Sequence, residues 1–179
     1  MPDTKPASEA ETIRLRHPCA EDGPEVHALI GRCAPLDPNS LYCNVLQCSH
    51  FSKTCALAER GGKLAGFASA FIEPNDPKAL FVWQVAVDRA ARGLGLGARL
   101  IVFLLDAPAC ANVRKLHATI GDGNHASWGM FEKVARRLGA PTSRRLLFDK
   151  NACFGGAHES EILLTVGPFN WPMSLKYAS

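Results

Sequence analysis

The segment from residue 80 to residue 105 constrains this chain most, because it changes from strand to helix across a glycine-rich turn. The run LFVWQVAV (80–87) is rich in β-branched and aromatic residues and predicts a central strand. After Gly95, leucine and isoleucine recur at helical spacing and predict a helix that ends near Pro108. A strand, a glycine loop and a helix in this order are typical of a phosphate-binding site in an α/β or α+β domain.

Backbone N–H groups at the start of such a helix point toward a bound phosphate, and glycine lets the backbone approach it closely. Arg89, Arg92 and Arg99 add positive charge nearby. A helix start that needs small residues is the alternative interpretation. A dinucleotide-binding turn is disfavoured because no acidic residue follows about 20 positions later, and a nucleotide-triphosphate loop would require Gly-Lys-Ser/Thr. The predicted phosphate-binding residues are Arg92, Gly93, Leu94, Gly95, Leu96, Gly97 and Ala98.

Length and composition indicate one globular domain, since the chain has 179 residues, of which 47% are hydrophobic and 21% charged. We expect a leader at 1–12, a catalytic domain at 13–167 and a tail at 168–179 around Trp171. The leader has neither a signal peptide's apolar run nor a membrane anchor. A formal charge of +3 is too small to indicate nucleic acid as the main ligand. These features favour a cytoplasmic protein without nucleic-acid or membrane partners.

Other segments alternate between strand and helix patterns. Capping residues are available for two of the helices: Asn39 or Ser40 for one and Asn124 or Ser127 for the other. The glycine pair at 61–62 predicts a tight hairpin turn. The expected strands are 13–18, 54–60, 63–72, 115–120 and a closing hairpin of 153–156 with 160–166, and the expected helices lie within 20–33, 40–48 and 124–138.

The cysteines and histidines show no pattern of a metal site or a disulfide framework. The 7 cysteines are an odd number without any C-x-x-C pair, which favours small buried thiols in a reducing cytoplasm. The 6 histidines show no H-x-x-x-H pair, so we expect no metal. Cys43, Cys55 and Cys153 could in principle carry an acyl group, but no Cys-His-Asp order accompanies them.

The pattern Arg92-x-x-Gly95-x-Gly97 after a strand resembles the signature of the GNAT superfamily of N-acetyltransferases, and residues 13–166 fit its element order. The resemblance implies a central mixed, mostly antiparallel sheet, splayed at the cofactor cleft and flanked by helices on both faces. It also implies acetyl-coenzyme A as cosubstrate and a homodimer. The strand backbone of Val85, Ala86 and Val87 would then lie against the pantetheine arm.

The helix start Asn124-His-Ala-Ser-Trp-Gly-Met-Phe131 is similar to the superfamily's Asn-x-x-Ala/Ser-x-x-x-Tyr pattern, which places Asn124, Ser127 and Phe131 beside the cofactor. Phe131 departs from the pattern. Members of the superfamily often use that tyrosine to protonate the leaving thiolate. Here water, Ser127 or Tyr42 would have to supply that proton.

Three further stretches resemble the GNAT family that acetylates the 4-amino group of L-2,4-diaminobutyrate during ectoine biosynthesis. They are Pro35-Leu-Asp-Pro-Asn-Ser-Leu-Tyr42, Phe81-Val-Trp-Gln-Val85 and His158-Glu-Ser-Glu161. The implied activity is direct acetyl transfer to that diamine, without an acyl-enzyme. Two alternatives stay open: acetylation of another small amine or a protein amine, and a catalytically inactive protein that binds coenzyme A.

A diamine acceptor needs anions to hold its ammonium groups, and Asp37, Glu73, Glu159 and Glu161 are available. Asp37 is a candidate substrate contact, or else a turn residue between Leu36 and Pro38.

Two aromatic residues are further substrate candidates. Tyr42 either donates a hydrogen bond in the acceptor site or packs in the core. Trp83 is a core residue or, as the resemblance favours, shelters an ammonium by cation–π attraction.

The cluster His158, Glu159 and Glu161 lies at the start of a strand. The acceptor arrives mostly as an ammonium ion, so acyl transfer needs a base, and we expect Glu159 or His158 to fill this role. His158 could instead be a surface or capping residue. Tyr42 is the third catalytic candidate, and Glu161 is assigned to substrate binding. The resemblance places a backbone N–H near Val85 against the developing oxyanion.

Overall fold

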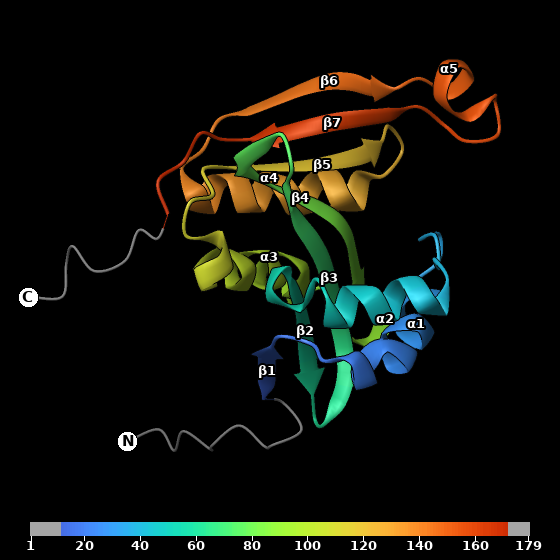
Figure 1. Cartoon of the computed structure of the whole chain (residues 1–179), viewed down its shortest axis with the longest axis vertical. Coiled ribbons are helices and arrows are strands. Elements are labelled where there is room, and N and C mark those ends of the chain that lie inside the picture. The colour runs from blue at the N-terminus through green and yellow to red at the C-terminus, as the bar shows by residue number, and fades with distance from the viewer. Residues whose placement is uncertain (1–11, 172–179) are drawn as a thin grey trace, which may run out of the picture.

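The computed structural model describes residues 12–171, which form one seven-stranded sheet in the order β1-β2-β3-β4-β5-β7-β6 (Figure 1). Only β4 and β5 pair in parallel, and the other neighbours are antiparallel. The strands are β1 (Ile13–Arg16), β2 (Cys55–Arg60), β3 (Lys63–Glu73), β4 (Asp76–Val87), β5 (Lys115–Gly121), β6 (Thr142–Phe148) and β7 (Glu161–Val166). The predicted mixed, mostly antiparallel sheet is confirmed.

The predicted helices are present, and two of their caps match the expectation. The Ser40 side chain accepts a hydrogen bond from the N–H of Cys43, and the Asn124 side chain accepts one from the N–H of Ser127. The α-helices are α1 (Gly23–Gly31), α2 (Leu41–Ser49), α3 (Leu96–Asp106), α4 (His125–Leu138) and α5 (Lys150–Phe154). The 3-10 helices are η2 (Ala20–Asp22), η3 (Ser52–Thr54), η4 (Arg89–Ala91) and η5 (Pro108–Cys110).

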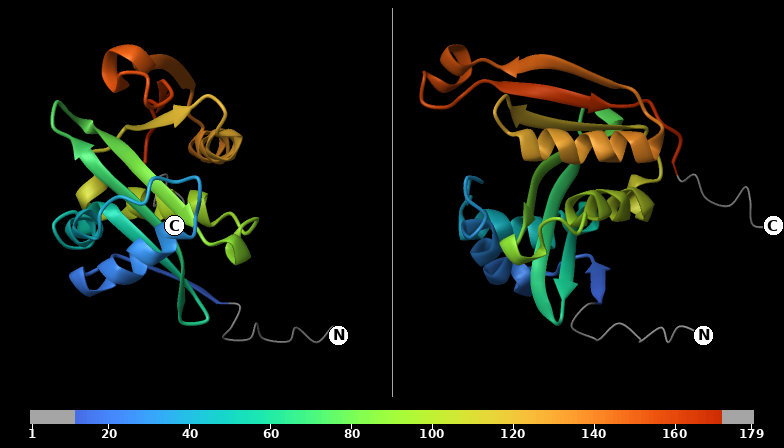
Figure 2. Two further views of the ribbon diagram at one scale, coloured as in Figure 1. Left: turned by 90° about the vertical axis from the view of Figure 1, so that its right-hand side faces the viewer. Right: turned by 180° about the vertical axis from the view of Figure 1, so that it is seen from behind.

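Helices cover both faces of the sheet, with α1 and α2 on one side and α3 and α4 on the other (Figure 2). Each layer has its own apolar core. Leu29 of α1 packs with Phe67 of β3 in the first core, and Leu100 of α3 packs with Phe131 and Leu164 in the second. The sheet therefore lies between two buried apolar layers.

β4 contains a bulge at Trp83. Ser69 of β3 pairs with Gln84 and Ala70 pairs with Val82, so Trp83 is an extra residue on β4. Such a residue bends the strand and shifts the alternation of side chains by one position.

The shift is visible in the two cores. Before the bulge Leu80 and Val82 pack on the α3 and α4 side, whereas after it Val85 and Val87 do so. Ala86 belongs to the core beneath α1 and α2.

The predicted closing hairpin is wrong in its first strand. Residues 153–156 lie in and after α5, and the partner of β7 is β6. In β6 every residue except Leu147 is exposed, so its sequence TSRRLLF carries no alternation of apolar and polar residues. Gly155 and Gly156, both at positive φ, end α5 rather than form a strand.

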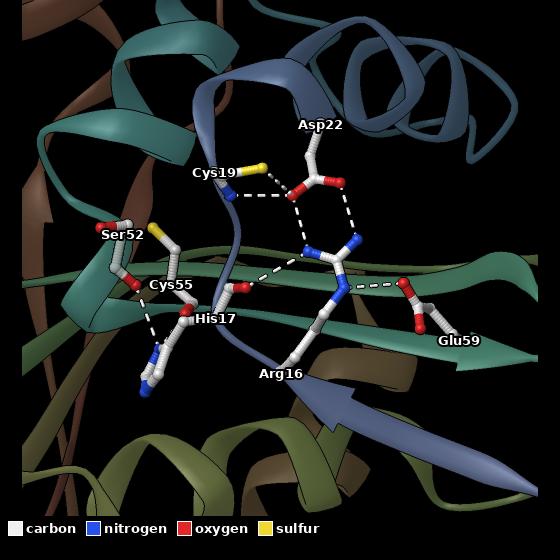
Figure 3. A network of polar contacts seen from close by, with 7 residues as sticks. All are labelled: Arg16, His17, Cys19, Asp22, Ser52, Cys55 and Glu59. Atoms are coloured by element: carbon white, nitrogen blue, oxygen red, sulfur yellow. Dashed lines mark hydrogen bonds and ion pairs between the residues drawn. The ribbon is translucent and has the colours of Figure 1, made fainter.

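One arginine fastens β1 to its neighbours (Figure 3). Arg16 donates to both carboxylate oxygens of Asp22 at 2.7 Å and to Glu59 of β2 at 2.7 Å. The Arg16 guanidinium lowers the pKa of Asp22 to about 2, and the Asp22 hydrogen bond in turn raises the pKa of Arg16. This network joins the first strand, η2 and β2 in one charged cluster.

The ends of the chain are partly described. Most of the expected leader, residues 1–11, and most of the expected tail, residues 172–179, lie outside the described residues. Phe169 is buried, and Nε1 of Trp171 donates to Asp106 at the end of α3 at 2.8 Å. Among the described residues, no helix combines the length and apolar character needed to cross a membrane.

Candidate active site

The glycine loop follows β4 as predicted and leads through η4 into α3. Gly93 and Gly95 have φ values of 83° and 70°, a region that glycine adopts far more readily than residues with a side chain. A Cβ at either position would meet nothing within 4 Å. These glycines are therefore required by backbone conformation and leave the loop surface open.

The first turn of α3 has no side-chain cap. Ser40, Asn124 and Asp149 cap the helices that they precede, whereas α3, which follows Gly95, has no side-chain cap, as is also true of α1. The first N–H groups of α3 are thus free to bind an anion, and the helix dipole favours negative charge there. Arg92 is exposed beside this turn and donates to the carbonyl of Val87 at 3.4 Å. These groups fit a pyrophosphate.

Gly97 has a different role from the other two glycines. A Cβ there would overlap the Sδ atom of Met130 in α4 and approach Val85 at 3.4 Å. This glycine therefore allows α3, α4 and β4 to pack closely together at the start of α3.

β4 and β5 separate beside this loop. Their parallel ladder contains three pairs and ends at Phe81 and His117, so the later residues of β4 have no pairing toward β5. On the other side, Val85, Ala86 and Val87 remain paired with β3. Backbone groups of the last part of β4 are thereby available to an extended ligand that lies between the two strands.

The start of α4 lies at the end of β5. Asn124 is exposed, Ser127 is partly buried, and Phe131 is 3% exposed within the core under α3 and α4. A cavity of about 650 Å³ borders Asn124 on the side of β6 and β7, between the loop 121–124, Arg144 and Glu159. Phe131 has no hydroxyl and therefore cannot donate a proton.

The predicted acceptor residues of the early part of the chain lie along one surface. Asp37 is exposed in the loop after α1, Tyr42 is 71% exposed in the first turn of α2, and Trp83 is 50% exposed on β4. Gln84, next to Trp83, donates to the backbone carbonyl of Asp37 at 2.7 Å. Tyr42 and Trp83 are therefore surface side chains here rather than core residues.

The cluster at 158–161 lies on the connection from β6 to β7. Glu159 bonds to Lys150 at 2.7 Å, which lowers its pKa, and its side chain is 78% exposed. Glu161 is mostly buried, which raises its pKa, and its Oε1 lies 3.9 Å from Nε2 of His158. Its buried Oε2 has no hydrogen-bond partner among the described residues.

Gln84 links the Asp37 loop to the strand that carries Trp83, and His158 contacts Glu159 and Glu161. Within residues 12–171, no hydrogen bond or ion pair joins 158–161 to Asp37, Tyr42 or Trp83. Figure 1 shows α5 and the loop between α1 and α2 at the same end of the molecule, on opposite sides of the point where β4 and β5 separate.

Two polar pairs near this surface were not predicted. Gln84 contacts the Asp37 loop, and its signal in the sequence was an amide within the apolar run 80–87. Nδ1 of His117 lies 2.6 Å from Glu73, beside the last pair of β4 and β5. No sequence signal links His117 to Glu73, because 44 positions separate them.

Five of the cysteines, including the candidates Cys43 and Cys55, are unsuited to covalent catalysis. All seven are free, and burial raises the pKa of Cys48 and Cys55 to about 12 and that of Cys110 to about 11. Burial also raises the pKa of Cys33 and Cys43. A raised pKa suppresses the nucleophilic thiolate. In the described part of the chain, no three His, Cys, Asp or Glu side chains are grouped as a metal site would require.

β4 separates from β5 beside the uncapped start of α3, which follows a glycine. This arrangement is typical of acyl-coenzyme A transferases, and comparison with known proteins identifies the family. The model of the acetyltransferase (GNAT) family matches residues 24–135, and the chain belongs to this family. The predicted family resemblance is confirmed.

The relatives are more specific. The chain is 46% identical over 157 residues to an L-2,4-diaminobutyric acid acetyltransferase of Methylotuvimicrobium alcaliphilum, covering 88% of this chain and 91% of the relative. It is 44% identical to the protein of the same name from Vibrio cholerae, covering 85% and 88% of the two chains. Diaminobutyrate acetyltransferase EctA from Paenibacillus lautus, solved with L-2,4-diaminobutyric acid and coenzyme A, matches with a TM-score of 0.85 and 35% identity, covering 92% and 99%.

Proposed function

We propose that this protein transfers the acetyl group of acetyl-coenzyme A to the 4-amino group of L-2,4-diaminobutyrate and yields N4-acetyl-L-2,4-diaminobutyrate for ectoine biosynthesis. The observation that carries this proposal is the match, over nearly the whole chain, to the Paenibacillus lautus enzyme bound to that diamine and coenzyme A. The open loop and the uncapped start of α3 support it independently.

In the proposed complex, residues 92–98 and the first turn of α3 bind the pyrophosphate, with Arg92 as the charged partner. The backbone of Val85–Val87 pairs with the pantetheine arm in the place of a missing strand, and Asn124, Ser127 and Phe131 border it. The residues fit this group, because the loop surface is open and β4 lacks pairing toward β5 beyond Phe81.

Asp37, Tyr42, Trp83 and Glu161 are the proposed acceptor contacts. Asp37 and Glu161 supply negative charge for the ammonium groups of the diamine, and the Trp83 ring offers a cation–π surface. The unpartnered Oε2 of Glu161 supports this assignment, since a buried carboxylate oxygen without a donor is costly unless a ligand satisfies it.

The reaction is direct. A base, Glu159 or His158, removes a proton from the 4-ammonium group, and the freed lone pair attacks the thioester carbonyl. The N–C bond forms while the C–S bond breaks, and a backbone N–H near Val85 stabilises the oxyanion. The attacking nitrogen then releases its second proton, which replaces the proton that the thiolate takes up. The thiolate takes up a proton from Tyr42, Ser127 or water. The exposed hydroxyl of Tyr42 supports its inclusion among these donors.

We further propose a homodimer that forms along β6, with residues 13–167 as the catalytic domain of each copy. β6 is an edge strand, and its Leu146 and Phe148 are 55% and 42% exposed. An exposed apolar edge strand of this kind is normally covered in solution.

The seven free cysteines support a reducing, cytoplasmic location.

A thiol-release assay with acetyl-coenzyme A and a panel of amines tests the activity. We expect the highest kcat/KM for L-2,4-diaminobutyrate, ahead of ornithine, lysine and polyamines. Equal activity on all amines would refute the acceptor assignment and leave the family intact. Tight coenzyme A binding without thiol release for any amine would instead favour a non-catalytic protein.

Sedimentation velocity tests the dimer. Leu146→Glu together with Phe148→Glu is expected to give monomers, whereas Phe51→Glu, at an aromatic side chain 46% exposed outside β6, should not alter the oligomeric state. A wild-type protein that sediments as a monomer would contradict the proposal.

A further inference from the structure

Gln84 holds a position that an apolar residue would normally fill. It lies on β4 directly after the bulge, its residue is 8% exposed, and it is the only amide or charged side chain in the run 80–87. A buried amide must find hydrogen-bond partners, because leaving its donor or acceptor unpaired is costly.

Both polar atoms of Gln84 are satisfied by one short loop. Its Nε2 donates to the backbone carbonyl of Asp37 at 2.7 Å, and its Oε1 accepts from Nδ2 of Asn39 at 3.1 Å. The loop is also closed internally, since the N–H of Asn39 donates to the Asp37 carboxylate at 3.2 Å. The Gln84 side chain therefore binds the loop both at Asp37 and at Asn39.

Asn39 is conformationally unusual. Its φ is 56°, and it is the only residue other than glycine with a positive φ in the described part of the chain. Asparagine tolerates this region better than most residues, although glycine adopts it more easily. Asparagine therefore occupies a position where glycine would lower the backbone strain. This indicates that the Asn39 side-chain amide has a role of its own.

The loop leads directly into the acceptor surface. Ser40 caps α2, and Tyr42 follows in the first helical turn. On the strand side, Trp83 precedes Gln84 and Val85 follows it. The bond network of Gln84 and Asn39 therefore connects Asp37 and Tyr42 on one side to Trp83 and Val85 on the other.

We propose that Gln84 and Asn39 are positioning residues that set the distance between the acceptor-binding loop and the strand that presents the acetyl group. The inference rests on the proposed function. Gln84 and Asn39 act through Asp37, Tyr42 and Trp83 rather than by touching the reacting atoms. Acceptor binding and its selectivity depend on this clamp, whereas acetyl-coenzyme A binding at residues 92–98 does not.

Two substitutions separate the side-chain bonds from the backbone conformation. Asn39→Gly keeps the positive φ and removes the amide, and Gln84→Leu removes both contacts while keeping a side chain of similar size. Gln84→Leu loses two neutral hydrogen bonds and is expected to raise KM for diaminobutyrate about tenfold, whereas Asn39→Gly loses one and is expected to raise it about threefold. KM for acetyl-coenzyme A should stay within about twofold. The double variant should resemble Gln84→Leu, since that substitution already removes the bond that Asn39→Gly removes.

Asn44→Ala is the structural control. Asn44 is a fully buried amide of α2 that forms hydrogen bonds with His27 and Gln47. Its loss should lower Tm, and it should not raise KM for the acceptor more than KM for acetyl-coenzyme A. If Gln84→Leu and Asn39→Gly lower Tm and leave KM for the acceptor unchanged, or raise both KM values equally, the positioning role is refuted.

Hydrogen exchange tests the clamp without any acceptor. Peptides that cover residues 36–42 should exchange faster in Asn39→Gly and Gln84→Leu than in the wild type, while residues 92–98 stay unchanged. Unchanged exchange at 36–42 would overturn the proposal even if the wild type is active. A wild type without diaminobutyrate activity would overturn the proposed function instead. In that case the KM comparison is repeated with the preferred amine. If no amine is acetylated, hydrogen exchange at residues 36–42 alone tests the clamp.

Discussion

Replacing Asp22 by asparagine should destabilise the protein and remove part of its acid sensitivity. The wild-type carboxylate is held by two hydrogen bonds from Arg16 and is 12% exposed (Figure 3). Its pKa falls from 3.8 to about 2, which corresponds to about 2 kcal/mol of stability at neutral pH. Asp22→Asn should therefore lower the free energy of unfolding by about 2 kcal/mol at pH 7.

The pH dependence follows from the direction of the shift. Because the unfolded chain binds this proton more tightly, the contribution is complete well above pH 3.8 and is lost as the pH falls toward 2. At about pH 3 roughly half of it remains. The difference in the free energy of unfolding between wild type and Asp22→Asn should therefore become smaller as the pH falls from 7 to 3. Urea unfolding followed by tryptophan fluorescence measures this difference between pH 7 and pH 3.

Glu132→Gln is the matched control. Glu132 pairs with Arg144 at 3.6 Å with both side chains more than half exposed, so we expect a change below about 0.5 kcal/mol. An Asp22→Asn effect as small as that of the control, or one that stays constant down to pH 3, would show that the network does not contribute as argued.

Three further predictions concern the site and its surroundings. Gly95→Val should weaken acetyl-coenzyme A binding more than tenfold in calorimetry, because a β-branched residue is strained at φ 70°; unchanged affinity would mean that the pyrophosphate lies elsewhere. Glu73→Gln should lower Tm by several degrees, since it weakens the 2.6 Å contact to His117 beside the last β4–β5 pair; a Tm equal to that of wild type would contradict this. Trp171→Phe removes the hydrogen bond to Asp106 and should cost about 1 kcal/mol in urea unfolding, and no loss would show that the last described residues do not stabilise α3.

Local patterns predicted most of the fold. The glycine pair at 61–62 gave the β2–β3 hairpin, and Ser40 and Asn124 marked two helix starts correctly. β4 begins at Asp76 instead of residue 80, because Asp76 pairs with Glu73 although Asp76, Pro77 and Lys78 precede the apolar run and show no strand pattern. β6 escaped prediction because its exposed residues show no periodicity.

The site was predictable only where chemistry follows the chain locally. The glycine loop forms one continuous segment, so its position between β4 and α3 could be inferred from spacing. Gln84 lies 45 and 47 positions from its partners Asn39 and Asp37, and only the folded sheet brings them together.

The extra residue at Trp83 also sets a limit on how this protein can be altered. If β4 paired with β3 in regular alternation while keeping every residue, the strand after Val82 would have its two faces exchanged. Val85 and Val87 would leave the core of α3 and α4, and Ala86 would enter it. Chimeras that exchange β4 with other members of the family therefore need joints that preserve the residue count on each side of Trp83. The length of this strand is as much a functional property as any of its side chains.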